Sequence, residues 1–304
     1  MRADGRFFGA LALCWIAAAS DAHAYCRTTT CDSLDPAREG VPCETDARGC
    51  VVEGIPLWRD PGCVTLWLSE EPEPLPGIDT AQLAELTLAA FETWQDASCD
   101  PGQPSFEARL NGTLECALTS FDPGALQEVD SVRVVREDWP HPQSLRDVAL
   151  TTVNFRPSTG EIIGASIEIN AEDNRFSLTP DSGAIDLPSA LAHEAGHALG
   201  LGHSDDRDAT MFPRTPAGSD ALRTLSSDDE AGICDVYPAT QDAAGACADT
   251  PAASASSVCE GAIVPRRASH GGCSAAPPGG ASAGWAAACV LALIGCARAR
   301  RRRA

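Results

Sequence analysis

Residues 193–203 read His-Glu-Ala-Gly-His-Ala-Leu-Gly-Leu-Gly-His, and their types and spacing suit a catalytic metal site. His193 and His197 are four residues apart, so on a helix both imidazoles leave the same face and can bind one ion. Glu194 follows the first histidine, where its carboxylate can hold and deprotonate a water that the metal activates. The helical part of the motif therefore predicts two metal ligands and a general base.

The third ligand comes from beyond the helix. Gly200 can adopt a left-handed conformation and end the helix, after which His203 supplies another nitrogen. Three protein ligands leave one coordination position open, which is typical of a catalytic zinc site. A chance match of the five fixed positions would occur in roughly one chain in 10⁵, and three of the chain's six histidines fall in this run. The alternative of ordinary surface histidines is therefore disfavoured.

The extended motif resembles the signature of the metzincin zinc peptidases. Ser204, directly after the third histidine, is similar to the matrixin branch of that clan. Residues 209–213 read Ala-Thr-Met-Phe-Pro and resemble the family's Met-turn, in which Met211 would form an apolar floor beneath the metal. Residues 225–234 resemble the start of the last matrixin helix. The resemblance extends over residues 57–238.

The resemblance implies an α+β catalytic domain, with a twisted five-stranded mixed sheet and three helices. It also implies hydrolysis of internal peptide bonds, with Glu194 taking a proton from water and passing it to the leaving amine. An alternative is a catalytically weak, zinc-containing surface adhesion or binding module, whose hallmark would be loss of this glutamate. A zinc hydrolase acting on a non-peptide bond is a third alternative, which the Met-turn disfavours.

Substrate contacts follow only from the resemblance. Residues 148–155 would be the strand at the edge above the cleft, where Leu150 and Thr152 would bind a peptide through main-chain hydrogen bonds. An ordinary edge strand without this role is an equal alternative. The residues implied at the primed-side pocket are Pro213, Arg214 and Thr215. Arg214 there would favour acidic or polar side chains, unless it points to solvent.

Two departures from the animal matrixins bear on metals and latency. The loop that carries their structural zinc ligands is replaced by a short turn, so we expect one zinc ion, the catalytic one. No Pro-Arg-Cys-Gly-type cysteine switch precedes the domain. Calcium is left open, because Asp173, Asp181 and Asp186 are available, but their irregular spacing favours an ordinary polar loop.

The N-terminus predicts export. Residues 1–24 have two arginines, an apolar stretch and a final Ala-His-Ala, as in a secretory signal peptide cleaved before Tyr25. Fourteen cysteines suit an oxidising compartment, and ten remain outside the signal peptide and the far C-terminus. A disulfide framework is therefore expected. The N-terminal cysteine spacings leave a second metal site as a less favoured alternative, since no histidine lies nearby.

The C-terminus predicts a temporary anchor. Cys273 follows two glycines, residues 281–297 are apolar, and five arginines follow within residues 298–303. This order resembles the myxobacterial C-terminal sorting tag, which implies a processed tail and a lipid on Cys273. The protein is then expected at the cell surface or outside the cell, held at first by its tail. A permanent tail anchor is the alternative.

Charge limits the partners. The formal net charge is −21, and every basic residue apart from histidine is an arginine. Such acidity disfavours nucleic acid and anionic membrane surfaces as partners. The resemblance implies a protein or peptide substrate, and a monomer is expected. The expected organisation is a signal peptide at 1–24, a cysteine-rich segment at 25–60, the peptidase domain at 61–238, a stalk at 239–280 and the sorting tail at 281–304.

Hydrophobic patterns predict the elements inside the domain. A helix is expected at 80–97, with Thr80 as its cap. Asp186 is expected to cap the helix that carries the motif, with Pro188 in its first turn. A bridge between Cys247 and Cys259 is expected to staple the stalk. The expected strands are 64–68, 105–110, 131–139, 148–155 and 161–170.

Overall fold

The computed structural model describes a defined part of the chain: residues 24–31, 38, 40–60, 62–69, 74–114, 129–141, 147–181, 183–239, 245–248 and the backbone of 268–275. The predicted signal peptide before Ala24, most of the stalk and the apolar span at 281–297 lie outside these residues. Within the described part, no helix is long and apolar enough to cross a membrane.

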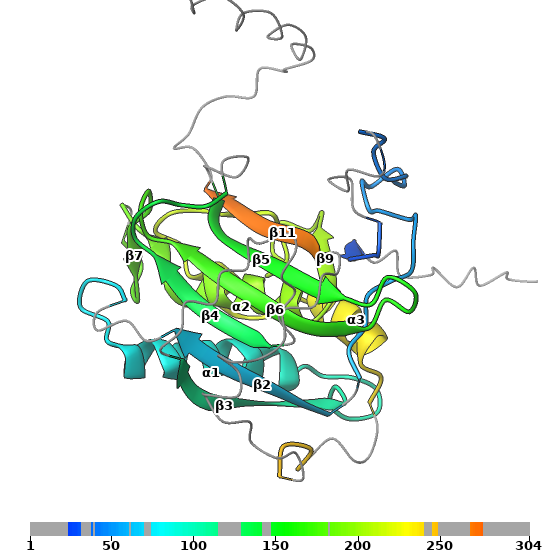
Figure 1. Cartoon of the computed structure of the whole chain (residues 1–304), viewed down its shortest axis with the longest axis horizontal. Coiled ribbons are helices and arrows are strands. Elements are labelled where there is room, and N and C mark those ends of the chain that lie inside the picture. The colour runs from blue at the N-terminus through cyan, green and yellow to red at the C-terminus, as the bar shows by residue number, and fades with distance from the viewer. Residues whose placement is uncertain are drawn as a thin grey trace, which may run out of the picture.

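The core of the fold is a mixed sheet (Figure 1). Five strands form its body, and β5 alone among them runs antiparallel to its neighbour, as expected for the predicted five-stranded mixed sheet. Two further strands extend it beyond β5. In spatial order the strands are β10 (Arg214–Thr215), β11 (Ala268–Ala275), β5 (Asp147–Phe155), β6 (Ile162–Asn170), β4 (Asp130–Val135), β2 (Gly62–Ser69) and β3 (Phe106–Leu114).

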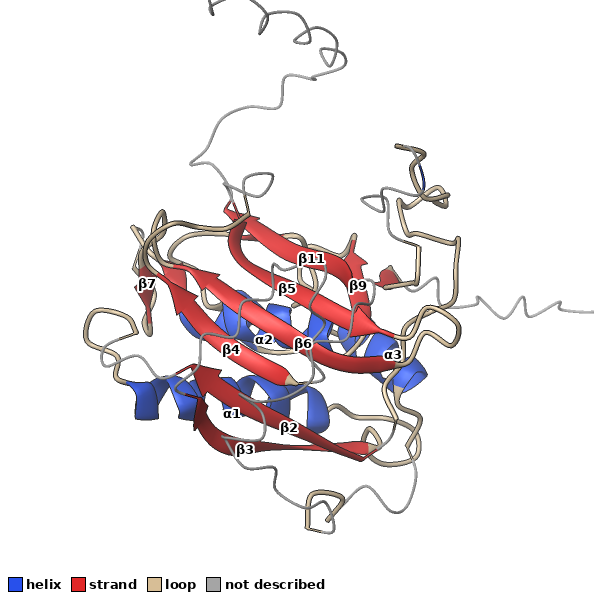
Figure 2. Cartoon of the chain, viewed as in Figure 1, coloured by secondary structure: helices blue, strands red, loops and turns tan. Residues whose placement is uncertain are grey.

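Three helices lie against one face of this sheet (Figure 2). They are α1 (Thr80–Gln95), α2 (Leu187–Ala198) and α3 (Ser227–Val236), and a short 3₁₀ turn, η2, spans Ala221–Arg223. Two small sheets pair β1 (Tyr25–Arg27) with β9 (Leu201–Ser204), and β7 (Phe176–Ser177) with β8 (Ile185–Asp186). The expected α+β architecture is therefore present.

The start of α1 differs from the expected cap by one residue. The cap is Asp79 and not Thr80: the Asp79 carboxylate accepts from the backbone N–H of Gln82, and the Gln82 side chain accepts from that of Asp79. This reciprocal capping box satisfies two N–H groups that the helix cannot pair internally. Aspartate is also a better cap than threonine, and its charge favours the positive end of the helix dipole.

The main core lies between the sheet and the helices. Trp94 of α1 is fully buried, and its indole N–H donates to the carbonyl of Ala192 in α2 at 2.8 Å. Tyr237, after α3, is buried against Phe106, and its hydroxyl donates to the carbonyl of Leu199 at 3.0 Å. These two large side chains therefore fix the middle and the C-terminal end of α2 by packing and by hydrogen bonds.

Four disulfides within the described residues confirm the predicted oxidised framework, and the Cys247 prediction is wrong. Cys247 bonds to Cys63 at the start of β2, so it ties the chain after α3 to the sheet and not to a stalk. Cys259, its expected partner, lies outside the described residues. The N-terminal cysteines form bridges, which supports the disulfide reading over a metal site. The bonds are Cys26–Cys50, Cys31–Cys43, Cys63–Cys247 and Cys99–Cys234.

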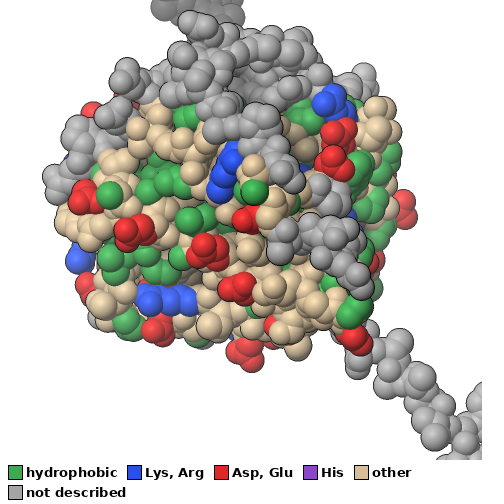
Figure 3. All heavy atoms as spheres, turned by 90° about the horizontal axis from the view of Figure 1, so that it is seen from below, with side chains coloured by type: hydrophobic (Ala, Val, Ile, Leu, Met, Phe, Trp, Pro, Cys, Tyr) green, Lys and Arg blue, Asp and Glu red, His purple; other side chains and the backbone are tan. Residues whose placement is uncertain are grey.

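The N-terminal segment is attached to the domain by a buried ion pair. Arg59 forms two hydrogen bonds of 2.7 Å to the carboxylate of Asp130 in β4, and both side chains are about nine-tenths buried. Arg59 also donates to the carbonyl of Ala198 at the end of α2. On the face in Figure 3, acidic side chains lie scattered among apolar and neutral ones, in keeping with the net charge of −21.

Candidate active site

Helix α2 carries the first half of the motif. Its N-cap is Asp186, as predicted, with Ser189 N–H donating to the carboxylate at 3.0 Å and a proline in the first turn. Leu199 caps the other end, and Gly200 follows with φ of +99°, a conformation that L side chains rarely adopt. This turn sends the chain into β9, which contains His203.

The three histidines converge. The Nε2 atoms of His193 and His197 are 3.1 Å apart, and the His203 ring centroid lies 5.3 Å and 4.9 Å from the centroids of the other two rings. One ligand nitrogen of each ring lies within 4.8 Å of the others. The structure therefore brings together the three residues that the sequence predicts as metal ligands.

The outer ring nitrogens orient the imidazoles. Nδ1 of His193 lies 2.7 Å from the carbonyl oxygen of Thr210, and Nδ1 of His197 lies 2.9 Å from that of Leu201. A carbonyl can only accept, so each Nδ1 carries the hydrogen and each Nε2 of a neutral ring presents a lone pair. Two lone pairs that face each other repel unless a cation lies between them. The donor set therefore fits a zinc ion held by the inner nitrogens.

Burial keeps these rings neutral. The pKa of His193 is lowered to about 3, mainly because the ring is buried away from water and to a lesser extent because His203 lies nearby. Burial, followed by the charges of His193 and His203, also holds the pKa of His197 well below its usual range. Neutral imidazole is the form that binds a metal ion, so the site is ready for a cation at neutral pH.

Thr151 of β5 holds the predicted general base. Glu194 is fully buried, and the Thr151 hydroxyl lies 2.6 Å from its Oε2 and 3.1 Å from its carbonyl oxygen. This contact ties the carboxylate to the strand beside α2. The sequence analysis missed Thr151, because a threonine in a buried strand has no local signal that marks it as part of a site.

Met211 packs against α2, where Gly196 makes room for it. Met211 is buried, and a side chain at Gly196 would overlap its sulfur and come 2.7 Å from the Trp94 ring. Asp229 in α3 fixes the Met-turn by accepting from the backbone N–H groups of Thr210 and Met211 at 2.7 and 3.0 Å. Burial raises the pKa of Asp229. The structure thus adds Gly196 and Asp229 to the supports of the site.

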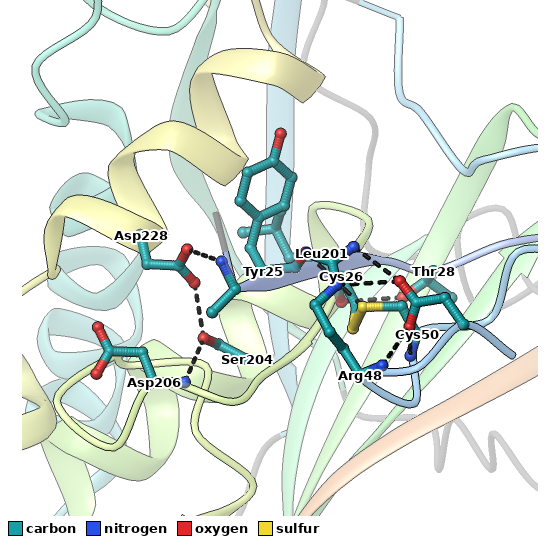
Figure 4. Close-up of a disulfide and its surroundings, with 11 residues drawn as sticks. Tyr25, Cys26, Thr28, Arg48, Cys50, Leu201, Ser204, Asp206 and Asp228 are labelled. Atoms are coloured by element: carbon teal, nitrogen blue, oxygen red, sulfur yellow. Dashed lines mark hydrogen bonds and ion pairs between the residues drawn. A yellow bond between two sulfur atoms is a disulfide. The ribbon is translucent and has the colours of Figure 1, made fainter. Parts of the chain in front are cut away.

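The N-terminal strand supports the third histidine (Figure 4). β1 pairs with β9, and the Cys26–Cys50 disulfide lies beside this pair. The Ser204 hydroxyl donates to Asp228 at 2.7 Å and accepts from the backbone N–H of Asp206 at 3.0 Å. The loop that carries His203 is therefore held between the N-terminal segment and α3.

The predicted substrate contacts lie beside this centre. Because side chains alternate along β5, Thr151 faces α2 while Leu150 and Thr152 face away from it. Leu150 packs with Val135 and Trp139, so its side chain is not available to a peptide. Thr215 of β10 is buried and Arg214 is exposed, whereas Pro213 is half-buried. The side chains of Leu150 and Thr152 are thus buried within the fold.

The carboxylates considered for calcium are not gathered into one site. Asp186 caps α2 and pairs with Arg223, Asp181 lies 3.5 Å from Arg175, and Asp173 contacts Asn170. The clusters of potential metal ligands within the described residues do not include the three aspartates.

Comparison with known proteins agrees with this geometry. Residues 140–238, about a third of the chain, match the matrixin family model. This match supports a matrixin-like metallopeptidase domain over these residues. The family is zinc-dependent, and several relatives are metalloendoproteinases or matrix metalloproteinases by name, which supports the predicted class of enzyme, a zinc metalloendopeptidase.

The relatives come from plants and animals. Metalloendoproteinase 4-MMP of Arabidopsis thaliana is 39% identical over 83 residues, or 27% of this chain and 23% of that protein. Human matrilysin is also 39% identical over 83 residues, which cover 30% of its length. Human matrix metalloproteinase-20 is 27% identical over 209 residues, 69% of this chain and 38% of that protein. The chain thus spans less than a third of the first two relatives.

Proposed function

We propose that the chain is an exported, zinc-dependent endopeptidase that hydrolyses internal peptide bonds of protein substrates. The observation that carries this proposal is the convergence of three imidazoles, two of them on α2 together with the buried Glu194. The alternative, a zinc-containing adhesion module without turnover, does not require a carboxylate at Glu194 or a hydrogen bond that positions it.

His193, His197 and His203 would hold one zinc ion through their inner nitrogens. When bound, the ion supplies a Lewis acid that polarises the scissile carbonyl and lowers the pKa of water to about 7. The carbonyl oxygens of Thr210 and Leu201 keep two of the imidazoles in the required tautomer and orientation. Met211 closes the floor of the site with an apolar side chain.

Glu194 acts as the general base. Its position next to His193 places the carboxylate at the metal site without using it as a ligand, and Thr151 fixes one oxygen by a hydrogen bond. The carboxylate takes a proton from the attacking water and passes it to the nitrogen of the leaving amine. A base that is held in one orientation does not have to be ordered during the reaction, so this positioning increases the rate of peptide hydrolysis.

The peptide would lie along β5. Main-chain groups of Leu150 and Thr152 would form a strand-like ladder with it, which gives affinity with little dependence on sequence. Pro213, Arg214 and Thr215 follow the Met-turn and would contact residues on the primed side. The exposed Arg214 there favours acidic or polar side chains.

The location is part of the proposal. Four disulfides fit an oxidising compartment outside the cytoplasm. Residues 1–24 would direct export, and the tail at 281–304 would hold the protein at the membrane until it is processed. The mature protein would then act at the cell surface or outside the cell.

Glu194→Gln tests the proposal. Because the three imidazoles are intact, the variant should bind zinc as the parent does, while peptide cleavage falls at least about 10²-fold. Glu92→Gln, on an exposed position of α1, is the matched control and should cleave normally. Both are incubated with a peptide library, with and without a chelator. Near-normal turnover by zinc-loaded Glu194→Gln contradicts the role of Glu194.

A further inference from the structure

The edge of β5 is already occupied. Strand β11 (Ala268–Ala275) pairs with β5 in antiparallel register from Ala268 opposite Asn154 to Ser274 opposite Asp147. Its other side pairs in parallel with β10, where Ser274 and Ala275 lie opposite Arg214 and Thr215. In Figure 1 this orange strand runs along β5 at the edge of the five-stranded body.

β11 lies at the catalytic centre and not only at a remote part of the edge. Gly271 is the partner of Thr151, whose hydroxyl is 2.6 Å from the Glu194 carboxylate. His270 and Gly272 are the partners of Thr152 and Leu150, and the strand also runs close to α2. Its backbone thus uses the same groups of β5 and β10 that a peptide substrate would use.

We infer that Ala268–Ala275 is a built-in occupant of the peptide-binding edge, which excludes other peptides until it leaves. This inference rests on the proposed function, because it assigns to β5 the role of binding substrate. One strand edge offers one row of N–H and C=O groups, so two peptides cannot pair with it at once. Pairing of β5 with Ala268–Ala275 and pairing of β5 with a substrate are therefore mutually exclusive.

Tethering makes this occupancy effective. The Cys63–Cys247 disulfide anchors the chain to β2, and about 20 residues separate Cys247 from Ala268. A tether of this length gives an effective concentration of roughly a millimolar, well above that of most free peptides. Two adjacent glycines weaken the strand itself, so the pairing can open. Removal of Ala268–Ala275 would then uncover the site.

The test uses the full, zinc-loaded chain and changes two glycines to proline. Neighbouring N–H groups of a strand point to opposite sides, so Gly271→Pro together with Gly272→Pro removes at least one donor to β5. The same change at Gly279 and Gly280, a second Gly-Gly pair beyond β11, is the matched control. Cleavage of a quenched peptide should rise about tenfold or more in the first variant and stay within about twofold in the second.

A second readout does not depend on activity. In the Glu194→Gln background, amide hydrogen exchange of Leu150–Asn154 should accelerate in the Gly271/Gly272 variant and not in the control. Unchanged exchange overturns the occupancy. If exchange is faster but the Gly271/Gly272 variant cleaves peptide no faster than an active parent, the exclusion of substrate by β11 is overturned. Glu194-dependent cleavage of the parent chain within residues 268–275 would overturn it as well. Faster exchange when no variant cleaves any peptide supports the occupancy and refutes the proposed peptidase instead.

Discussion

A substitution at Gly196 tests how closely α2 packs against Met211 and Trp94. A Cβ at this position would overlap the Met211 sulfur and lie 2.7 Å from the Trp94 ring, well inside normal contact distance. The thioether can move, but the indole cannot, because it is fully buried and bonded to Ala192. The substitution Gly196→Ala therefore pushes α2 away from α1 or forces the ring out of place.

The magnitude follows from two opposing effects. Overpacking of this kind costs about 1–3 kcal/mol, and alanine in a helix interior recovers about 0.5–1 kcal/mol relative to glycine. The free energy of unfolding should fall by about 1–2 kcal/mol, which lowers Tm by about 2–8 °C in a domain of this size. Because Gly196 lies between Glu194 and His197, kcat/KM should also fall about tenfold or more.

The assay is thermal unfolding of the zinc-loaded chain in the Glu194→Gln background, with peptide cleavage measured separately in the active enzyme. The control is Gly183→Ala, whose nearest neighbour is the end of the exposed Arg175 side chain at 3.2 Å. That variant should stay within about 0.5 kcal/mol of the parent. If Gly196→Ala is as stable and active as the parent, the close packing of α2 on Met211 and Trp94 is refuted.

Three further outcomes are expected. Metal analysis of the folded chain should find one zinc ion per chain, whose removal by a chelator abolishes cleavage; two tightly held ions would reveal a site that the sequence analysis missed. Thr151→Val should lower kcat about 10-fold by freeing the Glu194 carboxylate, whereas Thr87→Val, which alters a buried hydroxyl without a partner among the described residues, should not. Mass spectrometry of the mature C-terminus should find no arginine cluster; an intact chain ending at Ala304 would favour a permanent anchor.

Local signals were enough to predict the parts of the fold that depend on neighbours in the sequence. The helical spacing of His193 and His197, the cap at Asp186 and the glycine after α2 are all contained within about 15 residues. The strands β2, β5 and β6 show apolar patterns that match their positions in the sheet. The cap of α1 was misassigned by one residue, since two cap-forming side chains stand next to each other.

Contacts between distant residues could not be predicted in the same way. Asp229 fixes the Met-turn from α3, and Thr151 reaches Glu194 from β5, across 43 positions in the chain. Nor does the strand pattern show that Glu168 is fully buried, because its partners Arg133 and His141 come from elsewhere in the chain. Such residues become recognisable only when the fold has placed their partners beside them.

β11 shows the same limit most clearly. Its sequence, Ala-Ser-His-Gly-Gly-Cys-Ser-Ala, has two glycines and no alternation of apolar residues, so nothing in it predicts a strand. The pairing depends instead on β5, which offers a row of backbone groups at the edge of the five-stranded body, and on a tether that keeps the segment near it. A small-residue segment can pair there because the backbone makes the contact. The row of backbone groups that would let β5 bind many peptides therefore also lets it pair with Ala268–Ala275.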